Sequence, residues 1–392
     1  MRNFKSFMIG AGLATLLLSS CANGTETKLT VSGLDPAAFD TIINGKTVKL
    51  YTLKNNNGME VCITNYGGRV VSLVVPDKNG QPTDVVLGFD NIHQYADTLN
   101  SPTDYGSSVG RYANRIKGSK FTLNGQEYQL KANDNGNCLH GGGNTGWMNQ
   151  VYDAEMTDEQ TLKLTITAED GENGFPGKVV AVTTYKVTDD NVLDITWEAT
   201  TDKETIINQT NHNYYNLSGD FTQPGYDQVL YVNADNFTPS DKLYIPTGEI
   251  KPVEGTPMDF RKAHAIGDSI KSAFDQIQNA GGYDHNFCLN TFKDGKGDDT
   301  QVCASLYSPK SGIFMEMFTN EPGVQVYSGN FQGVGNEVNI HHKKGLVYPQ
   351  HVSVCLESQK YPDSPNKADW VQPTLKPGEK YYSHAAYKFS IK

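Results

Sequence analysis

An acidic side chain follows a short apolar run near the C-terminal end of the sequence. Apolar residues alternate with polar ones over 352–356, which is the pattern of a strand with at least one buried face, and Glu357 ends this run. Pro362 and Pro365 disfavour helix directly afterwards, so we expect the chain to turn there. A carboxylate at the end of a buried strand is costly unless a partner satisfies it. Taken alone, however, Glu357 is more typical of a solvated strand end.

Other polar clusters interrupt the apolar pattern elsewhere in the chain. His140 enters three consecutive glycines, which let a backbone approach a ligand closely but also simply make a loose loop. If the chain around His212 is extended, His212 and Tyr214 lie on one face. Each cluster also has a structural interpretation, since Arg111 could pair with a surface acid and Asp284 could cap a turn. The clusters span residues 110–116, 137–143, 210–217 and 283–287, with a weaker one at 323–330.

The elements that must position these residues are short strands. A continuous apolar run covers 70–75, a long alternating run covers 381–391, and only 266–277 has helical spacing. Residues 293–300 are typical of an exposed hairpin tip. Many short strands separated by Gly, Asn and Asp turns predict an all-β sandwich or barrel with few short helices. Further alternating runs are 162–166, 180–182, 193–199, 230–234, 302–306 and 313–317.

Composition excludes several function classes. The chain has 392 residues, of which 37% are hydrophobic and 20% charged, as in ordinary globular proteins. Its net charge is -11 with no Lys/Arg cluster beyond 343–344, which argues against nucleic acid as a partner. No C-x-x-C spacing signals a zinc or redox site, and no motif for a metal, phosphate or redox cofactor is present. Cys62, Cys288, Cys303 and Cys355 stand in apolar runs typical of core residues.

The N-terminal residues resemble an export signal. Arg2 and Lys5 precede an apolar stretch at 7–18 that is too short to span a bilayer. The following Leu-Ser-Ser-Cys ends at Cys21 and resembles the lipobox of a bacterial lipoprotein, with Cys21 as the lipidated residue. The alternative is an ordinary secretory signal in which Cys21 is incidental. We therefore predict a lipoprotein signal peptide at 1–20, a tether at 21–40 and one domain at 41–392.

This signal implies an exported protein whose membrane contact is only its lipid anchor. Ala22 and Asn23 follow the cysteine, so no Asp for inner-membrane retention is present, which favours the outer membrane. The sequence leaves open whether the domain lies in the periplasm or at the cell surface. Apart from Cys21 the chain has an odd number of cysteines, so at least one thiol is free unless two chains pair.

Together, the polar clusters resemble the aldose 1-epimerases, also called galactose mutarotases. The matching segments occur in the family's order, and the resemblance covers roughly residue 40 to the C-terminus. The family's fold is one large antiparallel β-sandwich with the sugar in an open groove on one sheet, which agrees with the many strands predicted above. The segments that carry the resemblance are 110–116, 139–142, 211–217, 283–287 and 356–366.

The resemblance also implies roles for individual residues. His212 is expected to be the general acid and Glu357 the general base. Glu357 removes the proton of the C1 hydroxyl and His212 protonates the ring oxygen. The ring then opens and recloses on either face of the carbonyl. With ordinary pKa values near 4 and 6.5, the carboxylate is charged at pH 7 and the imidazole is poised to give a proton. The resemblance places Arg115, His140, Asp284 and Gln325 around the sugar hydroxyls, with Asn114 and Tyr214 beside them.

The expected function is interconversion of the α and β anomers of free aldohexoses by a monomer without a cofactor. A glycoside hydrolase is the main alternative, but it normally needs two carboxylates flanking one bond, and Asp284 is the only companion of Glu357 in the motifs. A sugar-binding lipoprotein without turnover is another, although both His212 and Glu357 are retained. A phosphosugar epimerase is a third alternative, but such an enzyme should show additional arginine residues around the groove. Differences from the family's usual pattern at 213, 215 and 352–354 leave the preferred sugar open.

Overall fold

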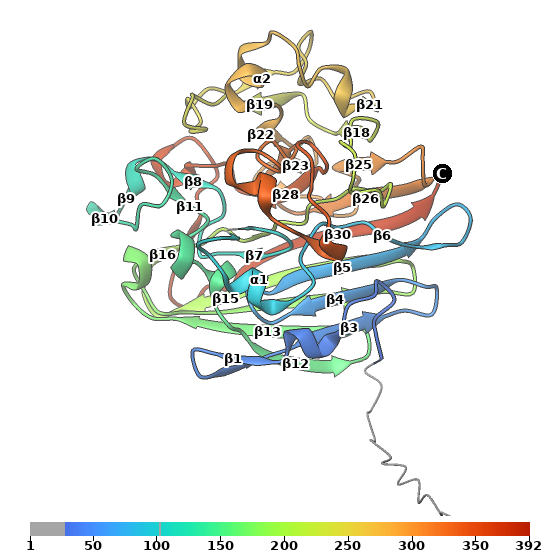
Figure 1. Ribbon diagram of the computed structural model, residues 1–392. Coiled ribbons are helices and arrows are strands. Elements are labelled where there is room, and N and C mark those ends of the chain that lie inside the picture. Colours follow the sequence, from blue (N-terminus) through green and yellow to red (C-terminus); the bar gives the residue numbers. More distant parts are fainter. Residues whose placement is uncertain (1–27, 102) are drawn as a thin grey trace, which may run out of the picture.

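The computed structural model describes residues 28–101 and 103–392 (Figure 1). The expected signal peptide at 1–20 and its Cys21 lie outside these residues. Strands dominate the described chain, and its two α-helices are short: α1 spans Ile92–Ala96 and α2 spans Asp275–Ala280. The expected all-β architecture with few short helices is therefore confirmed. Neither helix is long and apolar enough to cross a membrane.

The largest layer is a nine-stranded antiparallel sheet. Its strand order is β12-β13-β14-β15-β30-β26-β25-β18-β21, so the C-terminal strand β30 lies between β15 and β26 (Figure 1). The strands are β12 (Asp153–Asp158), β13 (Thr161–Ala168), β14 (Val179–Val187), β15 (Val192–Thr201), β18 (Val229–Val232), β21 (His264–Ala265), β25 (Ala304–Tyr307), β26 (Ile313–Thr319) and β30 (Tyr381–Ile391).

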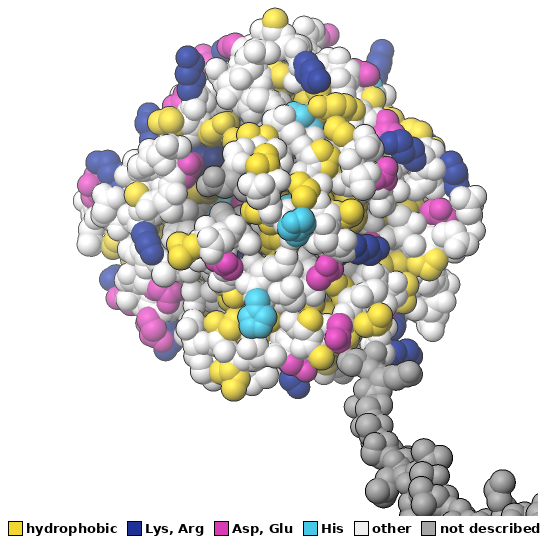
Figure 2. All heavy atoms as spheres, viewed as in Figure 1, with side chains coloured by type: hydrophobic (Ala, Val, Ile, Leu, Met, Phe, Trp, Pro, Cys, Tyr) yellow, Lys and Arg dark blue, Asp and Glu magenta, His cyan; other side chains and the backbone are white. Residues whose placement is uncertain are grey.

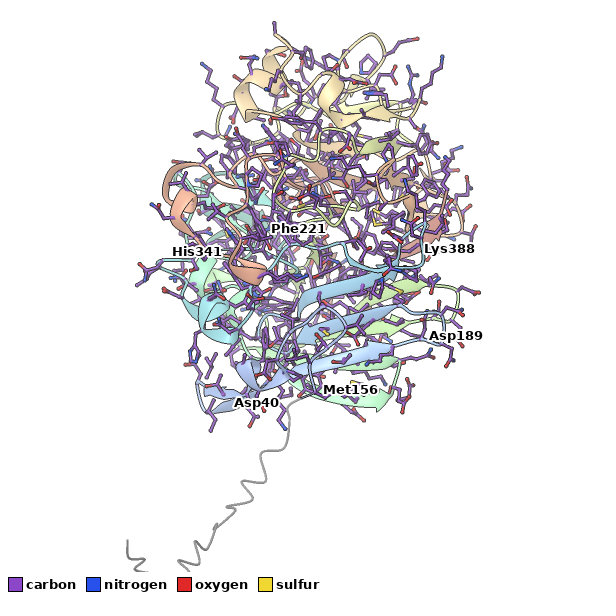
Figure 3. The ribbon with its side chains drawn as sticks, turned by 45° about the vertical axis from the view of Figure 1, so that its right-hand side comes forward. Asp40, Met156, Asp189, Phe221, His341 and Lys388 are labelled. Carbon is purple, nitrogen blue, oxygen red and sulfur yellow. The ribbon has the colours of Figure 1, made fainter. Side chains whose placement is uncertain are left out.

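Two smaller sheets pack against this layer. One has the order β3-β4-β5-β6 and the other β20-β19-β22-β27-β28. Figure 3 shows side chains filling the space between the layers, with Phe221 inside and Lys388 at the periphery. The strands are β3 (Leu50–Lys54), β4 (Glu60–Thr64), β5 (Arg69–Pro76), β6 (Pro82–Asp84), β19 (Asn236–Thr238), β20 (Lys251–Pro252), β22 (Asp284–Cys288), β27 (Gly323–Tyr327) and β28 (Cys355–Gln359).

The main core lies between the nine-stranded sheet and these smaller sheets. Strand alternation aims Trp197 of β15, Phe287 of β22 and Val326 of β27 into one apolar cluster, and none of the three is exposed. On β14 the buried face carries Val179 and Ala181, and Val180 and Val182 of the alternating run predicted at 180–182 lie on the opposite face. Both faces of this strand are rich in β-branched residues, so hydrophobicity alone does not fix which face is buried.

Short two-stranded ribbons connect the layers and carry several polar clusters. The residues with expected helical spacing form only a 3-10 turn at Ile266–Asp268 and the six-residue helix α2. The hairpin predicted at 293–300 is present as β23 (Phe292–Lys293) and β24 (Lys296–Gly297). The other paired strands are β1 (Thr41–Ile43) with β2 (Lys46–Val48), β7 (Ser108–Val109) with β17 (Thr210–Asn211), β8 (Arg115–Ile116) with β11 (Cys138–Leu139), β9 (Lys120–Leu123) with β10 (Gln126–Gln129), and β16 (Thr205–Ile206) with β29 (Thr374–Leu375).

Residues just before β1 already belong to the packed domain. Leu34 and Phe39 are buried in a second apolar cluster, and a 3-10 helix spans Pro36–Phe39. Ser32 also donates a hydrogen bond to the hydroxyl of Ser72 on β5. The packed structure therefore includes the C-terminal part of the predicted 21–40 tether.

The cysteines of the described chain form no disulfide. Cys62, Cys138, Cys303 and Cys355 are buried and Cys288 is half-buried, and all five are free thiols. Burial raises the pKa of Cys303 to about 12 and that of Cys62 to about 11. These thiols therefore act as small apolar core groups, as their sequence context indicates.

Candidate active site

Three strands of the five-stranded sheet place polar side chains on the face that points away from the core. Asp284 of β22 lies opposite Tyr327 of β27, and Gln325 of β27 lies opposite Glu357 of β28. Neighbours such as Val326 and Leu356 point into the core. Glu357 is the middle residue of β28 and does not end a strand, because pairing with β27 begins only at Cys355. Register therefore gathers carboxylates and an amide from three distant segments onto one face.

Two ribbons bring the basic residues to this face. Arg115 begins β8, whose partner β11 ends one residue before His140, and the backbone N–H of His140 donates to the carbonyl of Asn114 at 3.1 Å. His212 follows β17, and its N–H donates to the carbonyl of Ser107 at 2.9 Å. The two imidazole rings consequently lie with their centroids 5.3 Å apart in an edge-to-face arrangement.

A cavity of about 150 Å³ lies between these elements. Seven of the eight site residues predicted from the sequence line it, and the eighth, Gln325, does not. Gln325 instead donates to Asp284 Oδ1 at 2.6 Å and accepts from Gln359 at 3.0 Å, so it orients a lining carboxylate. The lining residues are Thr103, Asp104, Asn114, Arg115, Leu139, His140, His212, Tyr214, Asp284, Tyr327, Phe331, Gln332, Glu337 and Glu357.

His212 and Glu357 form a buried acid–base pair in this cavity. His212 Nε2 lies 3.5 Å from Glu357 Oε1, and the side chains are only 6% and 2% exposed. His212 Nδ1 and Glu357 Oε2 have no hydrogen-bond partner in the described chain. Buried polar atoms are normally satisfied, so these unpaired atoms indicate a site that is completed by a ligand or water.

Burial shifts both pKa values toward the neutral forms. It lowers the pKa of His212 to about 3, and it raises the pKa of Glu357 well above its ordinary range, with Asp284 and Asp104 adding repulsion. The sequence-based expectation of ordinary pKa values for this pair is therefore corrected. The two groups share one proton between them over a wide pH range, and the free site favours its location on Glu357.

His140 has a defined protonation state. Its Nδ1 accepts a hydrogen bond from the backbone N–H of Asn114 at 3.1 Å, so the neutral ring carries its proton on Nε2. Burial lowers the pKa of His140 and disfavours the doubly protonated ring. His140 therefore presents a single N–H donor away from Asn114.

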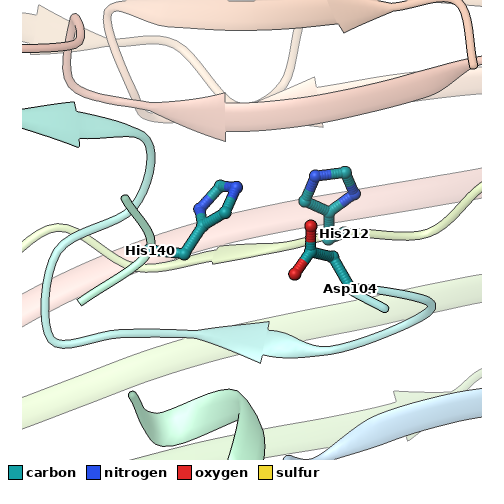
Figure 4. Close-up of side chains that lie close together, drawn as sticks. All are labelled: Asp104, His140 and His212. Carbon is teal, nitrogen blue, oxygen red and sulfur yellow. The ribbon is translucent and has the colours of Figure 1, made fainter. Parts of the chain in front are cut away.

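Asp104 lies beside both histidines. One ligand-type atom from each of Asp104, His140 and His212 lies within 4.8 Å of the other two (Figure 4). Although burial opposes ionisation, the surrounding His140, His212, Arg69 and Arg115 hold the pKa of Asp104 below its ordinary value. A charged acceptor thus stands next to the His140 donor.

The donor set of this cluster does not suit a metal ion. His140 has no free lone pair, because Asn114 occupies Nδ1 and the ring proton occupies Nε2. The three groups also make no direct hydrogen bond with one another, whereas ligand atoms around a tetrahedral zinc lie about 3.4 Å apart, given bonds of about 2.1 Å. The spacing and the protonation state instead suit a small hydroxyl-bearing ligand.

Arg115 is held in place from two sides. Its Nε donates to Asp134 Oδ2 at 2.7 Å, and its guanidinium carbon lies 4.8 Å from the centre of the Tyr244 ring. On the other side of the cavity, Tyr214 stacks on His212 with ring centroids 4.8 Å apart. These contacts fix the guanidinium and the imidazole before a ligand arrives.

The cavity is acidic. Four carboxylates line it, and Arg115 is the only Lys or Arg among the lining residues, where it already pairs with Asp134. On the face drawn in Figure 2, basic and acidic side chains are interspersed without a basic patch. An anionic ligand would therefore meet repulsion at this site. The four carboxylates are Asp104, Asp284, Glu337 and Glu357.

Several lining residues were not identified from the sequence. Glu337 belongs to a 3-10 helix at Gly335–Asn339, and burial raises its pKa to about 7. Asp104 precedes the 110–116 cluster within a segment of ordinary loop composition, and no pattern in the sequence distinguishes it. The other unidentified residues are Thr103, Phe331 and Gln332, whereas Leu139 and Tyr327 stand within the 137–143 and 323–330 clusters without having been assigned to the site.

Comparisons with known proteins agree with this geometry. The family model described as aldose 1-epimerase matches residues 49–388. Galactose mutarotase from Mus musculus is 37% identical over 347 residues, covering 88% of this chain and 95% of the relative. Aldose 1-epimerase from Escherichia coli strain K12 is 35% identical over 348 residues, covering 88% of this chain and 96% of the relative.

Solved structures show the same fold. An aldose epimerase homologue from C. elegans superposes with a TM-score of 0.79 at 28% identity, covering 88% of this chain and 99% of that chain. Galactose 1-epimerase from Lactobacillus acidophilus NCFM gives a TM-score of 0.75 at 29% identity, covering 90% of this chain and 97% of that chain.

Proposed function

The chain belongs to the aldose 1-epimerase family and interconverts the anomers of aldoses, and we propose that Glu357 and His212 move the protons of this reaction. The single observation that carries the assignment of roles is the buried pair itself. Two titratable groups lie 3.5 Å apart in a cavity, and each keeps one atom without a hydrogen-bond partner among the described residues. Such a pair can remove one proton and deliver another without help from solvent.

The reaction requires one proton to leave the C1 hydroxyl and one to reach the ring oxygen. In the proposed arrangement the shared proton lies on His212 when the sugar is bound. Glu357 then accepts the C1 proton while His212 protonates the ring oxygen, and the C1–O5 bond breaks. Rotation about C1–C2 presents the other face of the aldehyde, and the same groups reverse their roles. Because the pair returns to its starting protonation after each cycle, no net proton is consumed.

The remaining cavity residues hold hydroxyl groups in this proposal. Arg115 and His140 supply N–H donors, and Asp284 supplies acceptor oxygens in an orientation fixed by Gln325. Tyr214 and Asn114 shape the wall beside them. Burial raises the pKa of Asp284, against the opposing effect of Arg115, so a hydroxyl donor from the sugar would satisfy it.

Polarimetry tests this function directly. Freshly dissolved α-D-glucose and α-D-galactose should reach their equilibrium rotations faster with the purified protein than without it. p-Nitrophenyl glycosides should stay intact, because in the proposed mechanism the partner of Glu357 is a histidine in place of the second flanking carboxylate of a hydrolase. Nitrophenol release at a rate comparable with mutarotation would contradict the proposal.

We also propose that the protein is exported and anchored through a lipid on Cys21, with its domain in the periplasm or at the cell surface. The support is the lipobox-like Leu-Ser-Ser-Cys after a short apolar stretch, and the absence of an Asp after the cysteine favours the outer membrane. In this location the enzyme would meet free sugars before they enter the cell.

A further inference from the structure

The cluster of Asp104, His140 and His212 offers a more specific conclusion about the sugar. Its three polar groups lie within 4.8 Å of one another but do not bond directly (Figure 4). An oxygen atom placed centrally among three atoms with that spacing lies no more than about 2.8 Å from each of them, which is within hydrogen-bond reach. The centre of the cluster thus has the dimensions of one hydroxyl position.

The hydrogen-bonding capacity of Asp104 and His140 fits a hydroxyl group and not an ether or carbonyl oxygen. His140 offers only a donor there, since Asn114 fixes its proton on Nε2. Asp104 is ionised and offers only an acceptor. A hydroxyl group is both an acceptor and a donor, so it can satisfy His140 and Asp104 at the same time.

The position of the cluster relative to Glu357 identifies which hydroxyl this is. Glu357 Oε1 lies 3.5 Å from His212 Nε2, but Glu357 does not belong to the cluster. A second cavity of about 380 Å³ is lined by Asp104 and His140 but by neither His212 nor Glu357, so the cluster marks the end of the site away from Glu357. In the proposed function the C1 hydroxyl lies at Glu357 and the ring oxygen at His212. The other neighbour of the ring oxygen is C5, which carries the hydroxymethyl group of a hexose.

We propose that Asp104 is a specificity-determining residue that, with His140, binds the C6 hydroxyl of the sugar and so selects aldohexoses over pentoses and 6-deoxyhexoses. This inference rests on the proposed function, because that function sets the direction in which the ring lies. A sugar lacking the C6 hydroxyl leaves the Asp104 carboxylate without its hydrogen-bond donor. A 6-phosphate would instead bring negative charge against Asp104 and would also be rejected.

The test compares α-D-glucose, 6-deoxy-α-D-glucose and α-D-xylose as mutarotation substrates. The wild type should prefer glucose in kcat/KM by about tenfold or more, the effect of one hydrogen bond to a charged group. Asp104→Ala should lower kcat/KM for glucose by about the same factor and bring the glucose to 6-deoxyglucose ratio close to one. Asp104→Asn keeps the shape and one acceptor, so its ratio should fall between these values. Asp158→Ala, which removes an exposed carboxylate far from the lining residues, is the matched control and should behave as wild type.

A binding measurement separates this inference from the proposed function. 1,5-Anhydro-D-glucitol keeps the ring and C6 hydroxyl but has no anomeric hydroxyl, so calorimetry reports binding without turnover. Asp104→Ala should weaken its binding about tenfold. Equal losses for glucose and 6-deoxyglucose, or unchanged kinetics and binding in Asp104→Ala, would overturn the assignment of the C6 hydroxyl. A wild type that accelerates mutarotation of no sugar would instead overturn the proposed function.

Discussion

Gln325 and Glu357 lie directly opposite each other on β27 and β28. This pairing places the hydrogen-bonded side-chain amides of Gln325 and Gln359 beside the reactive carboxylate. Gln325 bonds to Asp284 on one side and to Gln359 on the other, while Glu357 Oε2 keeps no partner in the described chain. The amides of Gln325 and Gln359 thus bond to each other and leave the Glu357 carboxylate available. Once the shared proton lies on His212, no amide of the described chain competes for Glu357 Oε2, so this oxygen can accept the C1 proton.

Substitution of the acid–base pair should affect turnover more than binding. Glu357→Gln keeps the shape of the side chain but cannot accept the C1 proton, so we expect kcat to fall by roughly 100-fold or more. His212→Asn should have a similar effect. Polarimetry after subtraction of the spontaneous rate measures the loss, and calorimetry with 1,5-anhydro-D-glucitol checks that binding survives. Near-full activity of Glu357→Gln would place the base elsewhere, with Asp284 as the next candidate; the exposed Glu155→Gln is the matched control.

The pH profile should be broader than ordinary pKa values suggest. The active pair carries one proton, and it gains a second only below the lowered pKa of His212, about 3. It loses its last proton only above the pKa of Glu357, which burial raises. Activity should therefore stay level from about pH 4 through neutrality and then decline on the alkaline side. A fall in kcat/KM between pH 7 and pH 5 would show that the imidazole and carboxylate titrate near their ordinary values.

Asp134 should act on the sugar through Arg115. Asp134→Asn keeps a side chain of equal size but removes the charge that holds the guanidinium at 2.7 Å. We expect KM for glucose to rise roughly 2- to 10-fold with kcat little changed, since this pair is partly exposed and hydroxyl contacts form in ground and transition states alike. A loss confined to kcat would mean that Arg115 takes part in the proton transfers.

The anchor has a direct test. A Cys21→Ser protein should leave the membrane fraction, while the activity of its folded domain is retained because the packed residues begin well after the cysteine. Labelled palmitate should be incorporated into the wild type alone. Retention of the variant on membranes after a high-salt wash would indicate that the stretch ending at Cys21 is not a lipoprotein signal.

Lys343 should stabilise the fold through a buried ion pair. Its Nζ donates to Asp84 at 2.6 Å and to the carbonyl of Val86 at 2.8 Å, and neither charged side chain is exposed by more than 5%. Lys343→Ala leaves Asp84 buried and unpaired, so the free energy of unfolding should fall by about 3–5 kcal/mol. Lys344→Ala changes the exposed neighbour and should cost less than about 0.5 kcal/mol. Equal midpoints for the two variants in a urea titration would contradict this role.

The sequence predicts the strands and most of the residues that line the cavity. It does not predict how the strands pair or which of their faces are buried. Period-two alternation identifies β14 and β28, yet it does not say which face of β14 is buried or that Glu357 stands in the middle of β28. Those features depend on partners far away in the chain. The polar clusters stand out against the apolar pattern, and the resemblance to the aldose 1-epimerases implies the roles of their residues. Asp104 does not stand out, because a single loop acid becomes notable only once folding places it beside His140 and His212.

The central position of β30 has a consequence for biosynthesis. This strand pairs with β15 on one side and β26 on the other, and it is the last element of the chain. A chain that ends before Tyr381 leaves the nine-stranded sheet as two halves with open inner edges, and unpaired edges are prone to association with other chains. The sheet can therefore close only once β30 has been made, and pairing over such sequence distances is slow. In the proposed export, such late closure would favour an unfolded chain, which is the form that a translocation channel accepts.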